Sequence, residues 1–384
     1  MNGRESKATS QRQPVAAYVH VPFCRHRCGY CNFTLVAGRD DLIESYLQAI
    51  ELELQTLQSP HAVETLFLGG GTPSHLSASQ LNRLFNLLEK WFPLGENAEV
   101  SVEVNPADID KAKANVLAEC GVTRISIGGQ SFDEQRLKLL ERDHTPQQIR
   151  DVVFTLRPIV KSISLDLIFG VPDCTLEAWE KDLDETLSLP IDHVSTYGLT
   201  FEKGTSFWTR QHHGELAAVD EGIERQMYAS AIDRLTANGI EHYEVSNFGR
   251  TGHRCRHNET YWRGEQFWAV GPGAARFIGG RREVNHRSTT TYIKKMLAGE
   301  SPIAEVETLS AEASARERFI FAMRRLAGVS RSWFREVSGF EIDELFSDAL
   351  PRHVADGWLQ DDGETIALTR EGLYISDALW VDYV

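Results

Sequence analysis

Three cysteines near the start of the chain have the spacing of a metal-binding loop. Cys24, Cys28 and Cys31 form the pattern Cys-x3-Cys-x2-Cys. Thiolates are soft ligands that suit zinc and iron–sulfur clusters. The other three cysteines, at positions 120, 174 and 255, are scattered, and the chain is far longer than a small disulfide-rich domain. The grouping therefore indicates metal or redox chemistry at residues 24–31.

The number of clustered cysteines favours one kind of centre. A structural zinc site normally has four protein ligands. Three thiolates fit a cubane [4Fe–4S] cluster, in which three irons are anchored and the fourth is open to an exogenous ligand. The alternative is a zinc site completed by His20 or His26. The tight spacing, directly after a predicted strand, favours the cluster.

Other residues suited to ligand binding follow or end apolar segments. Gly69–Thr72 is a glycine-rich stretch before Pro73, and glycine permits close backbone approach to a ligand. A plain tight turn is the alternative there. Glu103 ends one apolar run and Asp166 lies inside another. A carboxylate that ends a buried strand is costly unless it is paired, which favours a function for Glu103.

The elements that position these residues alternate in type. Apolar segments alternate with amphipathic helical patterns over about the first 250 residues. The predicted strands are 17–21, 65–68, 99–104, 124–127, 162–168 and 193–199. Such units predict an α/β fold with a parallel sheet, curled into a partial (β/α)6 TIM-like barrel. Ligands in these folds lie at the carboxyl ends of the strands, where the cysteines and glycines are expected.

The last part of the chain has a different pattern. Helical patterns at 310–326, 330–337 and 341–356 precede a hairpin signal at Asp362-Gly363. We therefore predict a winged-helix-like domain at 308–384. It contains 8 basic and 14 acidic residues, which argues against DNA binding and favours a packing or interaction role.

Composition limits the remaining classes. The chain has 384 residues, a formal net charge of −15 and 42% hydrophobic residues, as expected of a globular protein. The charge opposes binding to nucleic acid or anionic membranes. No apolar run is long enough for a transmembrane helix, and the polar start lacks a signal-peptide core. We expect a cytoplasmic protein with a disordered tail at 1–14, a core at 15–250 and a connecting segment at 251–307.

The chain also resembles a known family. Tyr18–Cys24 (YVHVPFC), leading into the cysteine motif, is similar to the radical SAM group that contains the oxygen-independent coproporphyrinogen III oxidases. The closest resemblance is to its heme-chaperone branch, HemW, whose HNxxYW signature matches His257–Trp262. The resemblance covers nearly all of the chain after residue 15. It implies a [4Fe–4S] cluster on Cys24, Cys28 and Cys31, with S-adenosylmethionine bound to the open iron.

The resemblance also implies roles for single residues. The residues expected at the S-adenosylmethionine site are Tyr18, Tyr30, Gly71, Thr72, Pro73, Glu103, Gln130, Arg142 and Asp166. For heme iron, His257 is the first candidate ligand and Cys255 the second. The plainer alternatives are core packing for Tyr18, a surface ion pair for Arg142 and a metal-free capping loop around His257.

Three functions are compatible with these features. The first is a heme chaperone that delivers heme to respiratory hemoproteins. The second is an oxygen-independent coproporphyrinogen III oxidase of heme biosynthesis, and the third a cluster-containing winged-helix regulator. Such oxidases typically carry another cysteine two residues after the third one, where this chain has Phe33, and a longer N-terminal segment. We therefore expect the chaperone rather than the oxidase, and leave open whether the protein is an enzyme.

Overall fold

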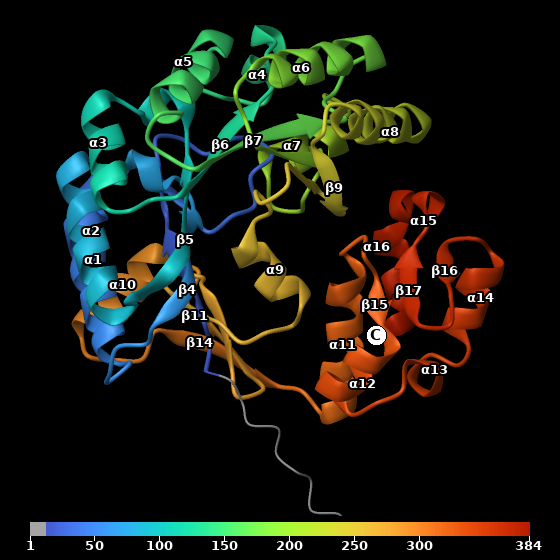
Figure 1. The fold of residues 1–384 in the computed structure, drawn as a ribbon. Coiled ribbons are helices and arrows are strands. Elements are labelled where there is room, and N and C mark those ends of the chain that lie inside the picture. The colour runs from blue at the N-terminus through green and yellow to red at the C-terminus, as the bar shows by residue number, and fades with distance from the viewer. Residues whose placement is uncertain (1–12) are drawn as a thin grey trace, which may run out of the picture.

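The computed structural model describes residues 13–384, so nearly all of the predicted disordered tail lies outside the described residues. Its main body is one curved nine-stranded sheet with helices around the outside (Figure 1). In spatial order the strands are β11 (Trp268–Val270), β1 (Ala16–Val21), β4 (Val63–Gly70), β5 (Leu94–Val104), β6 (Arg124–Gln130), β7 (Ser162–Phe169), β8 (His193–Gly198), β10 (Asn247–Gly249) and β9 (Glu241–Glu244).

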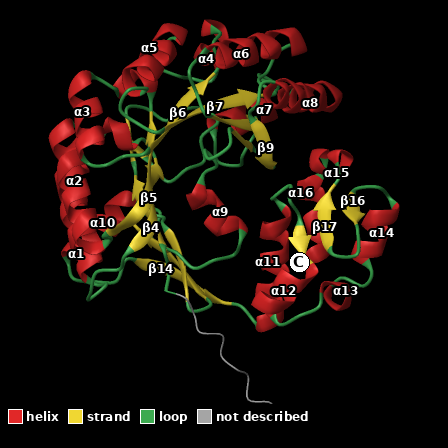
Figure 2. Cartoon of the chain, in the orientation of Figure 1, coloured by secondary structure: helices red, strands yellow, loops and turns green. Residues whose placement is uncertain are grey.

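The six central strands, from β1 to β8 in this order, are the six predicted from the sequence. Each pairs in parallel with the next, and most of their residues are buried. The intervening helices cover the convex face (Figure 2). They are α1 (Ile43–Gln55), α2 (Ala78–Trp91), α3 (Lys111–Glu119), α4 (Glu134–Leu139), α5 (Pro146–Leu156), α6 (Leu176–Ser188) and, after β8, α8 (Glu221–Ala237). Helix α7 (Ser206–His212) lies instead against the cysteine loop, where the Phe207 amide donates to the Gly29 carbonyl at 2.9 Å. This arrangement confirms the predicted α/β fold with a partial barrel.

The edges of the sheet leave the barrel open. On one side β11 adds a parallel strand to β1, and on the other β10 and β9 are antiparallel. The two outermost strands, β11 and β9, are not paired with each other. The predicted connecting segment 251–307 thus contributes strand β11 to the main sheet. This strand was not predicted from the sequence, because it has only three residues.

Local signals in the sequence define the ends of several helices. Ser77 caps α2 by accepting a hydrogen bond from the Gln80 amide, and the Gln80 side chain accepts one from the Ser77 amide. This reciprocal pair is a capping box, which the Ser-x-x-Gln spacing in the sequence encodes. Gly121 follows α3 with a φ of +71°, the left-handed conformation that is typical of a glycine that terminates a helix.

The chain between the barrel strands and the C-terminal part adds two helices and one small sheet. Helix α9 (Arg256–Trp262) lies in the opening of the barrel, where it contacts β4 and the C-terminal part of the chain (Figure 1). The other elements of this segment are the sheet of β12 (Ala275–Ile278), β13 (Arg281–Asn285) and β14 (Ile303–Thr308), and helix α10 (Thr289–Leu297).

A few short elements lie earlier in the chain, between the barrel strands. They are β2 (Phe23–Cys24), which pairs with β3 (Val36–Ala37), and the 3-10 turns η1 (Asp40–Leu42), η2 (Pro73–His75) and η3 (Pro106–Asp108).

The C-terminal part has the predicted helices and hairpin, with one correction. Its elements are α11 (Ala311–Met323), β15 (Val329–Ser330), α12 (Arg331–Ser338), α13 (Ile342–Leu345), α14 (Ala349–Ala355), β16 (Leu359–Asp361), β17 (Thr365–Leu368), α15 (Arg370–Tyr374), α16 (Ser376–Leu379) and η4 (Trp380–Tyr383). Strands β16 and β17 form the hairpin. The prediction of one helix over 341–356 was wrong. Pro351 has no amide hydrogen and its ring crowds the carbonyl four residues earlier, so the helix breaks before α14.

Ion pairs join the C-terminal part to the barrel. Arg225 of α8 binds Glu371 at 2.7 Å, and Asp233 of the same helix binds Arg370 at 2.8 Å.

Helix α8 has 17 residues. Among residues 13–384, no helix is both long enough and apolar enough to span a bilayer.

A buried carboxylate joins α1 to the segment that follows the barrel. Glu53 is only 1% exposed. It accepts hydrogen bonds from the Tyr292 hydroxyl at 2.5 Å, the Asn285 amide group at 2.6 Å and the Gly271 backbone at 2.8 Å. Because a buried carboxylate is costly without partners, these three bonds hold α10 and β13 against the barrel.

We predict that Tyr292→Phe lowers the free energy of unfolding by about 1–3 kcal/mol, since it removes one hydrogen bond from a buried carboxylate. Chemical denaturation measures this difference. As the matched control, Lys294→Ala on the exposed side of α10 is expected to change it by less than about 0.5 kcal/mol. Equal stabilities of wild type and Tyr292→Phe would contradict the role given to Glu53.

Candidate metal centre and barrel cavity

The cysteine loop follows β1 at the carboxyl end of the sheet. Strand β2 ends at Cys24 and pairs with β3, which closes residues 25–35 into a loop. Arg27 spans the loop by donating to the carbonyls of Cys31 at 3.2 Å and Leu35 at 3.1 Å. All three cysteines are half-buried and free of disulfides. Local backbone pairing therefore presents the three thiols from one short segment.

The thiols have separate neighbours and do not converge on one point. Cys24 Sγ lies 3.2 Å from Thr72 Oγ1, and Arg142 Nη1 lies 3.7 Å from Cys28 Sγ. Among residues 13–384, no three His, Cys, Asp or Glu side chains are placed to hold a single metal ion. A cubane binds each thiolate through a different iron, so it suits separated thiols. Burial raises the pKa of Cys24 to about 12, so binding of any metal there must displace a proton.

The histidines of the zinc alternative are engaged elsewhere. The His20 ring bonds Tyr18 Oη at 3.0 Å through Nδ1 and the Thr34 carbonyl at 2.7 Å through Nε2. The Nε2 atom of His26 bonds the Glu141 carbonyl and lies 3.8 Å from Cys28 Sγ. Neither imidazole completes a four-ligand set with the cysteines in this arrangement.

Arg142 places a positive charge beside the cysteine loop. Its Nη2 donates to the Gly128 carbonyl at 3.0 Å, while its buried Nε has no hydrogen-bond partner. Although burial opposes the charged form, Tyr30 and Cys28 hold the pKa of Arg142 above its ordinary value. A buried positive charge with one unsatisfied N–H group is costly, and an anionic cluster on the neighbouring thiolates would offset that cost. The residues present therefore fit an iron–sulfur cluster.

The glycine-rich turn packs tightly against the chain that enters the cysteine loop. The Gly71 amide donates to the Val21 carbonyl at 2.8 Å. A Cβ at Gly71 would lie 2.7 Å from the carbonyl carbon of Pro22 and 2.9 Å from the Phe23 oxygen. Only glycine fits there, and Thr72 is thereby placed beside Cys24. Pro73, which is buried, opens η2.

A cavity of about 230 Å³ lies inside the barrel below this turn. Glu103 and Asp166 line it, together with Tyr18. Glu103 Oε2 accepts a hydrogen bond from the Gly70 amide at 3.0 Å, which links the cavity to the turn. Burial, with a contribution from Asp166, raises the pKa of Glu103 to about 7. Asp166 accepts from Ser126 Oγ at 2.9 Å, and burial raises its pKa as well.

The remaining predicted S-adenosylmethionine residues lie near the cysteine loop. The Tyr30 ring packs edge-on against Phe207, with centroids 6.1 Å apart, and burial raises the pKa of its hydroxyl. Gln130 ends β6 with a φ of +65°, a left-handed conformation that is uncommon for a residue with a side chain. Its side chain lies near that of Arg142, because a Cβ built at Gly128 would meet Gln130 Nε2 at 3.1 Å and Arg142 Nη2 at 3.3 Å. The structure thus brings the nine predicted residues to the loop, the turn and the adjoining cavity.

Cys255 and His257 lie at the opposite end of that cavity. They adjoin Thr65 and Glu99, toward the amino ends of the parallel strands. The His257 ring bonds Thr65 Oγ1 at 2.9 Å and Tyr261 Oη at 2.7 Å, and burial lowers its pKa to about 3. Cys255 is 2% exposed. Neither candidate heme ligand faces solvent in this conformation.

Glu99 organises this end of the barrel and was missed in the sequence. Its carboxylate accepts hydrogen bonds from the backbone amides of Arg256 at 3.0 Å and His257 at 3.1 Å. These are the first amides of α9, which would otherwise be unsatisfied. One signal in the sequence could have revealed it. Glu99 lies four residues before Glu103 in the same strand, and alternate residues of a strand point to the same face of the sheet, so both carboxylates face the barrel interior.

Comparison with known proteins gives consistent results along the whole chain. The Radical SAM superfamily model matches residues 18–186, and the HemN C-terminal domain model matches residues 309–375. Heme chaperone HemW of Bacillus subtilis is 33% identical over 95% of this chain and 98% of its own length. The protein of the same name from Lactococcus lactis is 33% identical over 97% of this chain and 98% of its own.

A solved structure has the same fold. The coproporphyrinogen III oxidase HemN from Escherichia coli, described as a radical SAM enzyme, superposes with a TM-score of 0.85. The superposition covers 97% of this chain and 90% of that one, at 22% sequence identity. This likeness establishes the fold, including the C-terminal helical part.

Gly71→Ala is expected to disturb the cysteine loop, because its Cβ would overlap the Pro22 backbone. We predict a loss of about 1–3 kcal/mol in stability and a lower iron and sulfide content after anaerobic reconstitution. The matched control is Gly95→Ala, whose nearest neighbour would be the Val63 oxygen at an ordinary 3.6 Å. A Gly71→Ala protein with wild-type stability and cluster content would refute this packing argument.

The raised pKa of Glu103 predicts a pH-dependent stability. Unfolding lowers the pKa of this carboxyl from about 7 toward its ordinary 4.5, so deprotonation favours the unfolded chain. The contribution of the protonated carboxyl to the free energy of unfolding is present below pH 4.5 and is lost as the pH rises through about 7. Over that interval the wild type should lose about 1–3 kcal/mol more stability than Glu103→Gln. Parallel denaturation profiles of the two proteins across this range would show that Glu103 has no such shift.

Proposed function

The chain belongs to the HemW family of the radical SAM superfamily, and we propose that it is a heme chaperone that binds heme and delivers it to hemoproteins. The observation that carries the proposal is the likeness to heme chaperones over almost the full length of both chains. As recipients we propose hemoproteins of the respiratory chain. The cytoplasmic location and the absence of nucleic-acid binding stay predictions from the sequence.

We also propose that the protein holds a [4Fe–4S] cluster and S-adenosylmethionine. Cys24, Cys28 and Cys31 would anchor the cluster, and the placement of Arg142 beside Cys28 supports an anionic group there. One-electron reduction of the sulfonium is the chemistry that such a pair supplies when both are bound.

The residues around the loop would divide the binding of S-adenosylmethionine among them. Gly71, Thr72 and Pro73 present backbone and hydroxyl groups beside Cys24. Glu103 offers a carboxylate at the junction of turn and cavity, suited to the ribose hydroxyls or the amino group. Tyr30 offers an aromatic face within the cysteine loop. The other proposed contacts are Tyr18, Gln130, Arg142 and Asp166.

The oxidase and the regulator are weaker alternatives. The structural likeness to HemN is at 22% identity and therefore concerns the fold rather than the reaction. Phe33 occupies the position two residues after Cys31, where the oxidases carry a cysteine, and its ring is 68% exposed. The acidic balance of residues 308–384 speaks against DNA binding by a regulator.

A heme-transfer experiment tests the proposed function. We predict that anaerobically reconstituted protein gives a saturable spectral change with heme and then loses that heme to a heme-free acceptor of the respiratory type. Iron and sulfide should be present in the ratio of a [4Fe–4S] cluster. Absence of saturable heme binding would refute the chaperone.

Two controls separate the parts of this proposal. A variant with Cys24, Cys28 and Cys31 all changed to alanine should lose the cluster, whereas Cys120→Ala should keep it. Incubation with coproporphyrinogen III, reductant and S-adenosylmethionine should yield no protoporphyrinogen. Clear formation of that product would replace the chaperone with the oxidase.

A further inference from the structure

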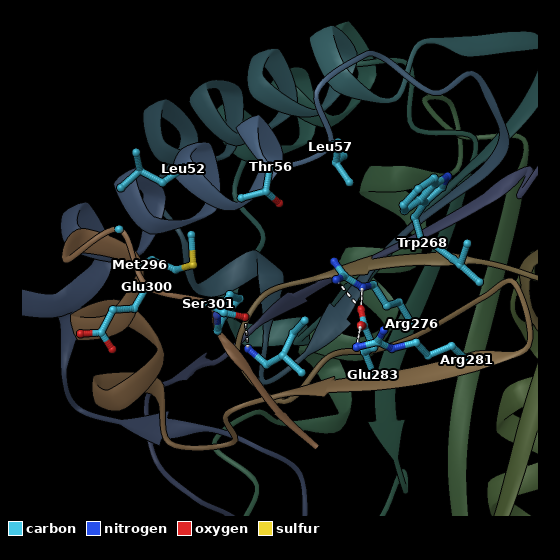
Figure 3. A pocket seen from close by; sticks show the side chains of 14 residues that line it. Leu52, Thr56, Leu57, Trp268, Arg276, Arg281, Glu283, Met296, Glu300 and Ser301 are labelled. Atoms are coloured by element: carbon cyan, nitrogen blue, oxygen red, sulfur yellow. Dashed lines mark hydrogen bonds and ion pairs between the residues drawn. The ribbon is translucent and has the colours of Figure 1, made fainter. Parts of the chain in front are cut away.

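A second cavity, of about 700 Å³, lies outside the barrel and has no part in the site described above. It is bounded by the end of α1, strand β11, the sheet of β12, β13 and β14, and the end of α10 (Figure 3). We propose that this outer cavity is the site where the chain holds its heme, with arginine side chains on the propionates and Met296 on the iron. The inference rests on the proposed heme-chaperone function.

Size separates the outer cavity from the inner cavity of the barrel. Pockets that enclose organic ligands have volumes of about 300–1,000 Å³. The outer cavity, at about 700 Å³, falls within that range, and the inner cavity, at about 230 Å³, falls below it. A porphyrin is a large rigid disc, so the outer cavity is the one that can receive it without rearrangement of the barrel.

The walls of the outer cavity suit an apolar planar ligand. Leu52 and Leu57 project from α1 on one side, and Ile278 and Ile303 from the small sheet contribute to the lining. Trp268, the first residue of β11, adds an aromatic face and stacks against the His61 ring at a centroid distance of 4.3 Å. Aromatic and aliphatic side chains of this kind stabilise a bound porphyrin face by removing it from water.

Charged groups opposite α1 supply complementarity to carboxylates. Figure 3 places Arg276, Glu283 and Arg281 together on the wall that faces Leu52 and Leu57. Glu283 pairs with both arginines, at 2.9 Å for Arg281. Two guanidinium groups thus share one carboxylate. The lining also contains Glu300, which pairs with Lys295 outside the lining at 3.0 Å, so the net positive charge is confined to the cluster of Arg276, Arg281 and Glu283. The Arg281 side chain is 53% exposed, so a propionate can form a charge-assisted pair with it beside its existing pair with Glu283.

Met296 is the lining residue suited to the iron. Heme proteins use His, Cys, Met or Tyr as axial ligands, and Met296 is the one such residue among the described residues that line the outer cavity. Its side chain is neutral and only 4% exposed, so binding of an iron requires Met296 to turn further toward the cavity. A single thioether ligand allows release, as a delivery protein requires. His257, by contrast, already bonds Thr65 and Tyr261 within the barrel.

Heme titration of matched variants tests the location. Arg281→Glu is expected to weaken heme binding about tenfold, since it replaces attraction of a propionate with repulsion. Arg287→Glu makes the same charge change at an exposed arginine outside the lining and should bind as the wild type does. Met296→Leu keeps the volume but removes the sulfur, and should alter the visible spectrum of bound heme.

Two porphyrin analogues separate the roles of charge and iron. Metal-free protoporphyrin should retain the sensitivity to Arg281→Glu and lose the sensitivity to Met296→Leu. Its dimethyl ester, which lacks carboxylates, should bind wild type and Arg281→Glu equally.

The outcomes also distinguish this inference from the proposed function. If the wild type binds heme and Arg281→Glu and Met296→Leu leave both affinity and spectrum unchanged, the outer cavity is not the heme site, and the chaperone function stands. A spectral change in His257→Ala alone would then assign the heme to α9. A wild type that binds no heme overturns both the cavity assignment and the chaperone function.

Discussion

The close approach of the glycine-rich turn to the chain that enters the cysteine loop is the constraint on which the site depends. The Gly71 amide meets the Val21 carbonyl at 2.8 Å, a contact that no larger residue would permit. This packing sets Thr72 against Cys24, and the neighbouring Gly70 amide then orients Glu103. Two adjacent parallel strands thereby fix the thiol loop, the turn and the first carboxylate as one unit.

The barrel encloses charged groups whose cost other contacts must offset. Glu103 and Asp166 line the inner cavity, and backbone or hydroxyl donors partly satisfy them. At the opposite end, Glu99 is satisfied by the first amides of α9, so this short helix closes the barrel through backbone hydrogen bonds. The interior is therefore polar from end to end, as suits a ligand site more than an inert core.

The segment after the barrel strands belongs to the same architecture. Glu53 of α1 binds Tyr292 and Asn285, and β11 extends the main sheet beside β1. These contacts hold α10 and the small sheet at a distance from α1 that leaves the outer cavity between them. The cavity is thus a consequence of how the two parts pack, not of any motif along the chain.

The sequence alone determined the six parallel strands, the capping box of α2 and the thiol loop, because buried strands, helix caps and metal loops are encoded by residues close together in the chain. Only the tertiary structure decided the place of α9, the edge strand β11 and the outer cavity. Glu99 and His257, for example, are 158 residues apart in the chain, and no local pattern encodes their contact. Residue types predict which groups are capable of chemistry, whereas packing between distant segments decides which of them meet.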